Sequence, residues 1–130
     1  MIYIAMPYRG KHGDNATPAE IQENILKAVS VANDIVKQFP SIEPYCPHAC
    51  PELEPLNDQW RAGEISTDDI MVRCIEKLNT CDSILIIGDM TEGMRLEYDE
   101  AEREGIDIYM YPEWNFETKK MFAHDWLSRR

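Results

Sequence analysis

Residues 83–88 read SILIIG, a nearly unbroken apolar run that ends at a glycine. Such a run, bounded by turn residues, is typical of a strand buried on both faces of a parallel sheet. Residues 91–107, TEGMRLEYDEAEREGID, then show the spacing of an amphipathic helix. Four residues share its apolar face: Met94, Tyr98, Ala101 and Gly105. We therefore predict a buried strand followed by a helix that stops at Gly105.

The acidic residues of this helix raise a question about Glu97. On a helical projection Glu100 and Arg103 fall on the far side, where solvated charges are expected, but Glu97 falls near the border of the apolar stripe. A carboxylate there has three common roles. It can pair with a cation such as Arg95 or Arg9, act as a general acid or base, or attack a carbon that carries a leaving group.

The rest of the chain alternates between strand and helix patterns. Residues 2–6, IYIAM, predict a strand, and residues 41–45 predict a weaker edge strand because they contain a proline. Residues 106–110 predict the last strand. Thr17 to Glu20 has the form of a capping box with proline at the first helical position, and it begins a strongly periodic helix.

Two further helices complete the pattern. Ser66 or Thr67 can cap a helix that carries Ile70, Cys74 and Leu78, and residues 116–127 predict a terminal helix. Strands that alternate with helices imply a parallel sheet covered on both faces. We predict one domain over residues 1–130, an α/β three-layer sandwich of the flavodoxin or Rossmann-like kind, with strand order 2-1-3-4 or an extension of it.

Composition narrows the possible partners. The 130 residues are 44% hydrophobic, with 13 Lys plus Arg against 24 Asp plus Glu, for a formal net charge of −11. This charge repels a phosphate backbone, so we expect no nucleic-acid partner. No apolar run approaches about 18 residues, and the N-terminus lacks signal-peptide features, so we expect no membrane association and a cytoplasmic location.

The four cysteines are expected to be reduced thiols in such a protein. Cys46, His48 and Cys50 lie close enough in sequence to suggest zinc, but a structural zinc site needs a fourth ligand and usually a second matching pair. The alternative is a proline-rich loop whose thiols pack. We predict no metal and no cofactor.

The predicted topology places a binding crevice at the carboxyl ends of the first and third strands, where the winding of the sheet reverses. Loops 6–10 and 88–93 meet there, and both contain glycine. An arginine suits a phosphate or carboxylate, and the helix after the second loop begins with free backbone amides. The candidate substrate-binding residues are Tyr8, Arg9, Gly10, Asp89, Thr91, Gly93 and Met94.

These motifs together resemble the nucleoside 2-deoxyribosyltransferase superfamily, over most of residues 1–110. The first strand and its loop, IYIAMPYRG, are similar to the family pattern YIAGPxRG, and Asp82 matches an acidic residue before the third strand. Five residues fit the frame around the family's catalytic glutamate: Thr91, Gly93, Glu97, Ala101 and Gly105. A closer likeness is to uncharacterised phage-type domains with YRG near the start, Pro-His after the second strand and SEGMRxE in this helix. The matching segments are residues 8–10, 47–48 and 92–97.

The resemblance implies cleavage of the N-glycosidic bond of a (deoxy)nucleotide or nucleoside. Glu97 would be the nucleophile at C1′ of the sugar, Tyr3 would assist, and Arg9 with Gly10 would hold a 5′-phosphate. The phosphate anchor favours a hydrolase over a base-exchange transferase. In this family a neighbouring subunit often completes the site, which implies a homodimer or larger homo-oligomer.

The chain departs from the family at two positions. Pro7 replaces a serine that binds phosphate, and Cys74 stands where the family has an aspartate that orients the substrate. Either a nearby aspartate (Asp68, Asp69 or Asp89) takes that role, or the activity is altered or absent. The alternative function is therefore a nucleotide-binding protein, sensing or sequestering its ligand, on the same scaffold.

Other candidates have equally plain structural interpretations. Tyr3 can pack in the core, and His48 can be a solvated loop residue or line the pocket. The aromatic residues near the C-terminus can cover the sheet or form a subunit contact; these are Trp114, Phe116, Phe122 and Trp126.

Overall fold

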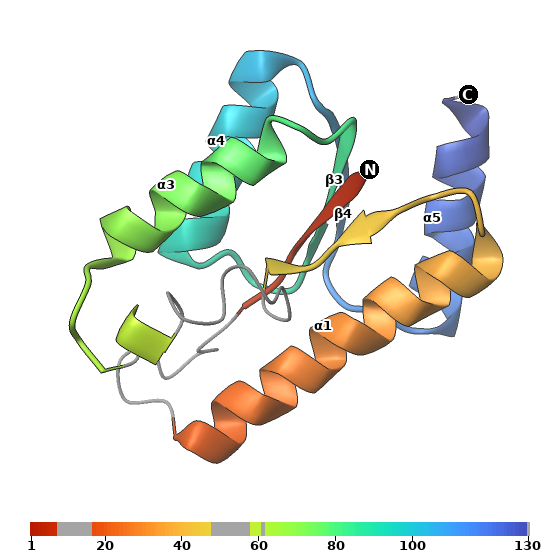
Figure 1. Ribbon diagram of the computed structural model, residues 1–130. Helices are drawn as coiled ribbons and strands as arrows, with labels where there is room; N and C mark the ends of the chain where they lie inside the picture. The colour runs from red at the N-terminus through yellow and green to blue at the C-terminus, as the bar shows by residue number, and fades with distance from the viewer. Residues whose placement is uncertain (8–16, 48–57, 61, 130) are drawn as a thin grey trace.

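The structure is a computed structural model that describes residues 1–7, 17–47, 58–60 and 62–129 (Figure 1). Strands and helices alternate along the chain. The elements are β1 (Ile2–Ala5), α1 (Pro18–Gln38), β2 (Pro44–Tyr45), α3 (Thr67–Leu78), β3 (Ser83–Ile87), α4 (Glu92–Glu104), β4 (Asp107–Tyr111) and α5 (Phe116–Ser128). In the part of the chain that is described, no helix is long and apolar enough to cross a membrane.

Four strands of the described residues form one parallel sheet in the order β2-β1-β3-β4. This order confirms the predicted 2-1-3-4 arrangement. Strand β3 lies in the interior, between β1 and β4, and each of its five residues is buried. The unbroken apolar run SILIIG thus reflects a strand that is covered on both faces.

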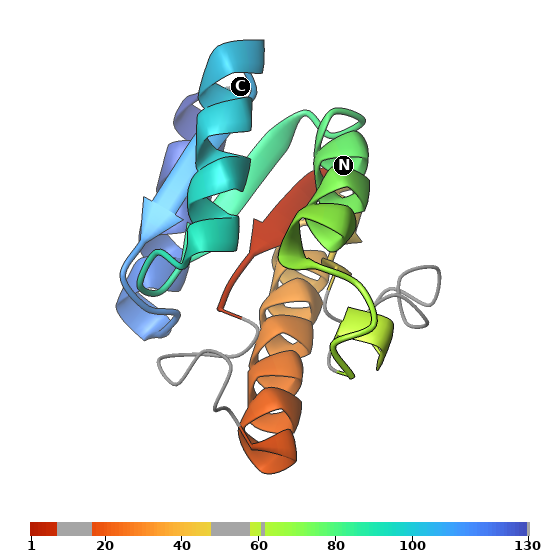
Figure 2. The ribbon, with the colours of Figure 1, turned by 90° about the vertical axis from the view of Figure 1, so that its left-hand side faces the viewer.

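Helices cover both faces of the sheet, so the predicted α/β sandwich is confirmed. Helices α1 and α5 lie on one side, and α3 and α4 lie side by side on the other (Figures 1 and 2). Alternate residues of β1 show the division. Ile2 and Ile4 pack with the α1 and α5 side chains, whereas Tyr3 and Ala5 pack with those of α3 and α4.

Local capping signals set the helix ends as predicted. Thr17 and Ser66 form capping boxes with Glu20 and Asp69 at the starts of α1 and α3. Gly105 ends α4 with a left-handed φ of 70°. The terminal helix α5 also begins with a capping box, at Asn115, which sequence reasoning had not identified.

The bounds of two strands and the exposure of one side chain, Glu100, differ from the predictions. The paired part of β2 is only Pro44–Tyr45, and β4 is shifted by one residue to Asp107–Tyr111. The solvated position predicted for Glu100 is wrong, because Glu100 is 8% exposed. Its carboxylate accepts a hydrogen bond from Asn79 Nδ2 at 3.1 Å and pairs with Arg103. A projection of one helix does not show that α3 covers this side of α4.

Three of the four C-terminal aromatic residues cover the sheet. Phe122 is fully buried beside Tyr109, with ring centroids 5.3 Å apart, and both Trp114 and Trp126 pack against the same core. Phe116 differs, since it is 72% exposed. The prediction that these aromatic residues cover the sheet is thus confirmed for Trp114, Phe122 and Trp126.

Candidate functional site

Pro7, which follows β1, lies against Gly88, which follows β3, at the carboxyl ends of these two strands. Gly88 has a φ of 95°, and a Cβ atom built on it would lie 3.2 Å from Pro7 Cδ. Glycine is therefore required here both for its backbone conformation and for the close approach of Pro7. The predicted substrate-binding residues Tyr8, Arg9 and Gly10 lie outside the described residues.

Helix α4 begins at Glu92, directly after the loop that contains Gly88. Thr91 is the N-cap, and its Oγ1 accepts a hydrogen bond from the Met94 backbone N–H at 3.2 Å. The Thr91 hydroxyl therefore caps the helix. Asp89 is exposed in the preceding loop, whereas Met94 is 2% exposed and belongs to the same core cluster as Tyr3.

Glu97 lies in the buried side of α4. Its exposed fraction is 6%, and the other buried residues of the helix are Met94, Glu100 and Ala101. On the helical projection, Glu97 falls between the apolar pair Met94 and Ala101 on one side and Glu100 on the other. Glu97 therefore lies well inside the buried face and not at its border. The reason is that α4 packs against α3 as well as against the sheet.

Two side chains from the helices lie close to the Tyr3 hydroxyl of β1: Cys74 from α3 and Glu97 from α4. All three are buried. The proximity of Glu97 and Cys74, together with burial, raises the pKa of the Tyr3 phenol well above its usual range, with burial as the largest cause. The cluster therefore joins the sheet to both helices on this face.

Burial also raises the pKa of Glu97 to about 7. The Tyr3 hydroxyl opposes this effect by donating toward the carboxylate, but the loss of water dominates. The Tyr3 oxygen has no partner of regular hydrogen-bond geometry among the described residues, so this contact is long or poorly aligned. Glu97 consequently changes its charge near neutral pH.

No basic side chain in the described ranges forms an ion pair with Glu97, in contrast to Glu100, which pairs with Arg103. Arg95, a predicted partner, is exposed, and its guanidinium lies 5.9 Å from the centre of the Tyr98 ring. A buried carboxylate without a cation is costly for folding. Such groups concentrate at functional sites, although they also occur in structural networks.

Tyr3 belongs both to the core and to this cluster. Its ring is fully buried, and its centroid lies 5.7 Å from that of Tyr45 on β2. Its hydroxyl reaches the Glu97 carboxylate on the α3 and α4 side of the sheet. The two interpretations of Tyr3 drawn from the sequence are therefore compatible.

Cys74 occupies the place at which the resemblance implies an aspartate, and no described aspartate replaces it beside Glu97. The Asp69 carboxylate accepts a hydrogen bond from the Ser66 backbone N–H at 3.1 Å, so it caps its own helix. Asp82 lies at the amino end of β3 and pairs with the N-terminal ammonium at 3.2 Å. The Asp68 side chain lies outside the described residues.

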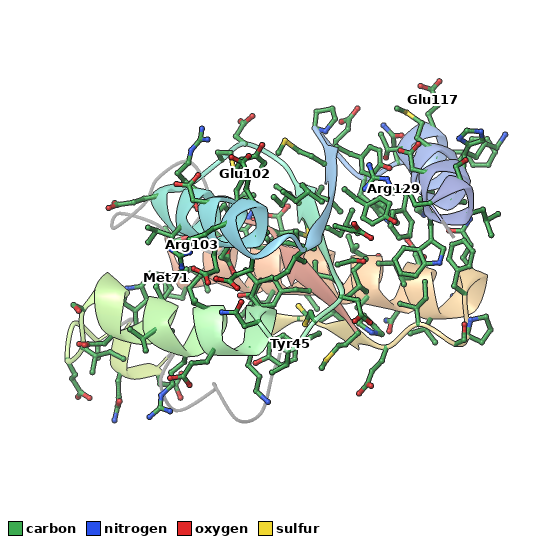
Figure 3. All side chains as sticks on the ribbon, turned by 90° about the horizontal axis from the view of Figure 1, so that it is seen from above. Tyr45, Met71, Glu102, Arg103, Glu117 and Arg129 are labelled. Carbon is green, nitrogen blue, oxygen red and sulfur yellow. The ribbon has the colours of Figure 1, made fainter. Side chains whose placement is uncertain are left out.

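Sequence reasoning did not identify Met71, which lies one helical turn before Cys74 on α3. The signal was its spacing of three residues from Cys74, which places both on one face of the helix. Figure 3 shows Met71 between α3 and α4. Its Sδ atom lies 3.2 Å from the position of a Cβ atom built on Gly93.

Within the described ranges, no group of three His, Cys, Asp or Glu side chains is arranged to hold a metal ion. Cys46 is half-buried, and both His48 and Cys50 lie outside those ranges.

Comparisons with curated proteins and with solved structures give no match. A family profile matches residues 1–111, which run from the start of the chain to the end of β4 and include Tyr3, Cys74 and Glu97. Since this match covers more than half of the sequence, the chain belongs to the family described as a domain of unknown function, DUF7768.

Proposed function

We propose that this protein cleaves the N-glycosidic bond of a (deoxy)nucleotide or nucleoside, with Glu97 as the nucleophile. The observation that carries the proposal is Glu97 itself, a buried carboxylate without a described cation partner, which lies beside the Tyr3 hydroxyl on the helix that follows β3. Ligands of open parallel sheets bind at the carboxyl ends of the strands, where the order of the strands reverses.

The chemistry of the cluster fits this reaction. The ionised carboxylate forms a bond to C1′ of the sugar while the bond from C1′ to the base nitrogen breaks, and the base leaves with that electron pair. Water then hydrolyses the glycosyl ester. Positive charge develops on the sugar in the transition state, and a carboxylate in a water-poor site stabilises that charge strongly.

Tyr3 is the second catalytic residue of the proposal. Its hydroxyl stabilises the ionised form of Glu97, because it lowers the pKa that burial has raised. A hydrolase is favoured over a base-exchange transferase because Arg9 and Gly10, outside the described residues, have the sequence of a phosphate anchor. A cytoplasmic location fits this substrate class, and the resemblance to the superfamily supports a homodimer or larger homo-oligomer in which a second copy of the chain completes the site.

The test is to incubate the full chain with a panel of deoxynucleoside and ribonucleoside monophosphates and to measure released base by chromatography. We expect release by the wild type and none by Glu97→Gln, which keeps the shape of the side chain but is not a nucleophile. We also expect the rate to rise with pH through about 7 as Glu97 ionises.

Glu100→Gln is the matched control, because Glu100 is a buried carboxylate on the same helix with its own partners, Asn79 and Arg103. It should release base at close to the wild-type rate. Release that persists in Glu97→Gln, or that is lost equally in Glu100→Gln, would contradict the assignment of Glu97 as nucleophile.

A second function is a nucleotide-binding protein that does not turn its ligand over. The observation that favours it is Cys74, since a cysteine occupies the place of a substrate-orienting aspartate, and Asp69 is used in capping its helix. Calorimetric titration with the same monophosphates separates the two functions. Tight binding of a nucleotide that is recovered intact after long incubation supports the binding protein.

A further inference from the structure

Met71 lies on α3 one helical turn before Cys74 and packs against Gly93 on α4. Helices α3 and α4 pack together on the same face of the sheet (Figure 2), and both begin near the carboxyl ends of the strands. Met71 of α3 crosses to Gly93 in the first turn of α4, with Sδ 3.2 Å from the place of a Cβ atom. A thioether therefore fills the space between the two helices at this level.

The direction of side chains on a helix places Glu97 under this thioether. A helical Cα–Cβ bond tilts toward the N-terminus, so a side chain covers the turn that precedes its own Cα. Gly93 is four residues before Glu97 and lies on the same side of α4. The Glu97 carboxylate thus leans toward Gly93, the position against which Met71 packs.

Gly93 has no side chain, and this leaves room for Met71. Gly93 is not among the glycines with a positive φ, so its backbone does not require glycine. Glycine stabilises a helix less than alanine does. A Cβ atom at this position would lie 3.2 Å from Met71 Sδ, so the absence of a side chain at Gly93 lets Met71 pack against the helix without shifting.

Methionine is suited to a covering position that must open. It is unbranched, with several rotatable bonds, and it repacks more easily than branched residues do. Met71 is half-buried and packs at the margin of the cluster that contains Tyr3, Cys74 and Met94. Its outer side is therefore open to solvent while its inner side faces the buried groups.

We infer that the Met71 side chain is a movable cover over the Glu97 carboxylate, and that it selects the substrates that reach this group by their size at the reacting carbon. Selection among nucleotides and nucleosides rests on the proposed function. The covering position of Met71 does not depend on the proposed function, because it follows from the packing of α3 against α4.

The test measures access to Glu97 without turnover. The full chain is treated at about pH 6 with a water-soluble carbodiimide and glycine ethyl ester, which convert reachable protonated carboxyl groups to amides, and each site is quantified by peptide mass spectrometry. We call the state in which Met71 has moved away from Glu97 the open state. If it is populated on the order of 10% or less, Met71→Ala should raise the rate of Glu97 amidation about tenfold. Met71→Leu, which restores an apolar side chain of similar size, should return the rate to near the wild-type value.

Two controls make the result specific. Val72→Ala changes the exposed neighbour of Met71 and should leave Glu97 amidation unchanged. Amidation of the equally buried Glu100 should remain constant in every variant, because general loosening of α4 would raise both sites. An unchanged Glu97 rate in Met71→Ala, or a rise shared with Glu100 or with Val72→Ala, would overturn the inference.

Base release by the same variants separates this inference from the proposed function. If Met71→Ala raises Glu97 amidation and no variant releases base, the cover stands and the N-glycosidase proposal fails. If the wild type releases base but Met71→Ala leaves both amidation and substrate preference unchanged, the proposed function stands and the cover is refuted.

Discussion

Two buried glutamates on one helix differ in their partners. Glu100 receives a hydrogen bond from Asn79 and pairs with Arg103, so its charge is satisfied inside the protein. Glu97 has the Tyr3 hydroxyl beside it and no described cation, and its pKa is raised to about 7. The contrast indicates that burial of Glu97 reduces stability, as is common where an active group is kept at a functional site.

At the residue scale, Glu97→Gln should stabilise the folded protein at alkaline pH. The folded-state pKa of about 7 lies above the ordinary value of 4.5, so the folded protein binds the extra proton and loses stability as pH rises from 4.5 through 7. The amide escapes this loss, which is at most about 3 kcal/mol. Urea denaturation should show the gain at pH 8.5 and a much smaller difference at pH 4.

Glu100→Gln provides the comparison for this prediction. It removes an ion pair with Arg103 and should give no gain at alkaline pH. A Glu97→Gln variant that is less stable than the wild type at pH 8.5 would refute the picture of a buried carboxylate without a compensating charge.

Tyr3→Phe should raise the pKa of Glu97 further. The Tyr3 hydroxyl is the group that lowers this pKa against the effect of burial, and phenylalanine keeps the ring while removing the hydroxyl. The measurement is a pH titration of the Glu97 carboxyl carbon by NMR, assigned by its loss in Glu97→Gln. A lower or unchanged pKa would show that the hydroxyl does not act on this carboxylate.

At the scale of elements, the two ends of the segment from β3 to β4 are fixed by glycines for different reasons. Both glycines have a positive φ. A Cβ atom built on Gly88 would lie 3.2 Å from Pro7 Cδ, whereas a Cβ atom built on Gly105 would have nothing within 4 Å. The first glycine holds two loops together at the site, and the second only ends α4.

Alanine at these two positions should therefore destabilise the protein unequally. Gly105→Ala should cost about 1–2 kcal/mol, the cost of a left-handed conformation for a residue with a Cβ atom. Gly88→Ala should cost at least about 1 kcal/mol more, because the methyl group also displaces Pro7. Free energies of unfolding from urea denaturation test this order, and equal losses would show that Pro7 moves freely.

At the scale of the whole molecule, α5 lies beyond the part of the chain that the family profile matches, which ends at residue 111. The helix nevertheless covers one face of the sheet. Phe122 is fully buried beside Tyr109 and Tyr111. Asp34 of α1 joins the two helices, since it pairs with Lys119 at 2.9 Å and accepts a hydrogen bond from Trp114 at 3.0 Å.

Phe122→Ala should cost about 3–5 kcal/mol, the usual result of emptying a fully buried aromatic position. Phe116→Ala is the control, because this residue of the same helix is 72% exposed, and it should change stability by no more than about 0.5 kcal/mol. Urea denaturation followed by tryptophan fluorescence measures both. Similar losses in the two variants would show that α5 does not close the core.

The fold was predictable because its signals are local. The run of residues 83–88 marks an interior strand, and Thr17, Ser66 and Gly105 mark helix ends through bonds to atoms a few residues away. The handedness of parallel connections limits the possible strand orders to a few, and the flavodoxin-like order is a common one among them. The short β2 was the least well predicted strand, because its pairing depends on β1 and not on its own sequence.

The sequence by itself was enough to predict the sandwich, its strand order and Glu97 as a candidate catalytic residue. Hydrophobic periodicity and capping residues act within one segment, so they can be read from the sequence. Only the tertiary structure decided that the Tyr3 hydroxyl of β1 lies beside Glu97, that Cys74 of α3 lies beside the same hydroxyl, and that Met71 packs against Gly93. It also decided that Glu100 is buried and paired. The physical reason is that burial and the pKa of a carboxyl group depend on the neighbours that packing supplies, and a helical projection contains only one of the three packed elements.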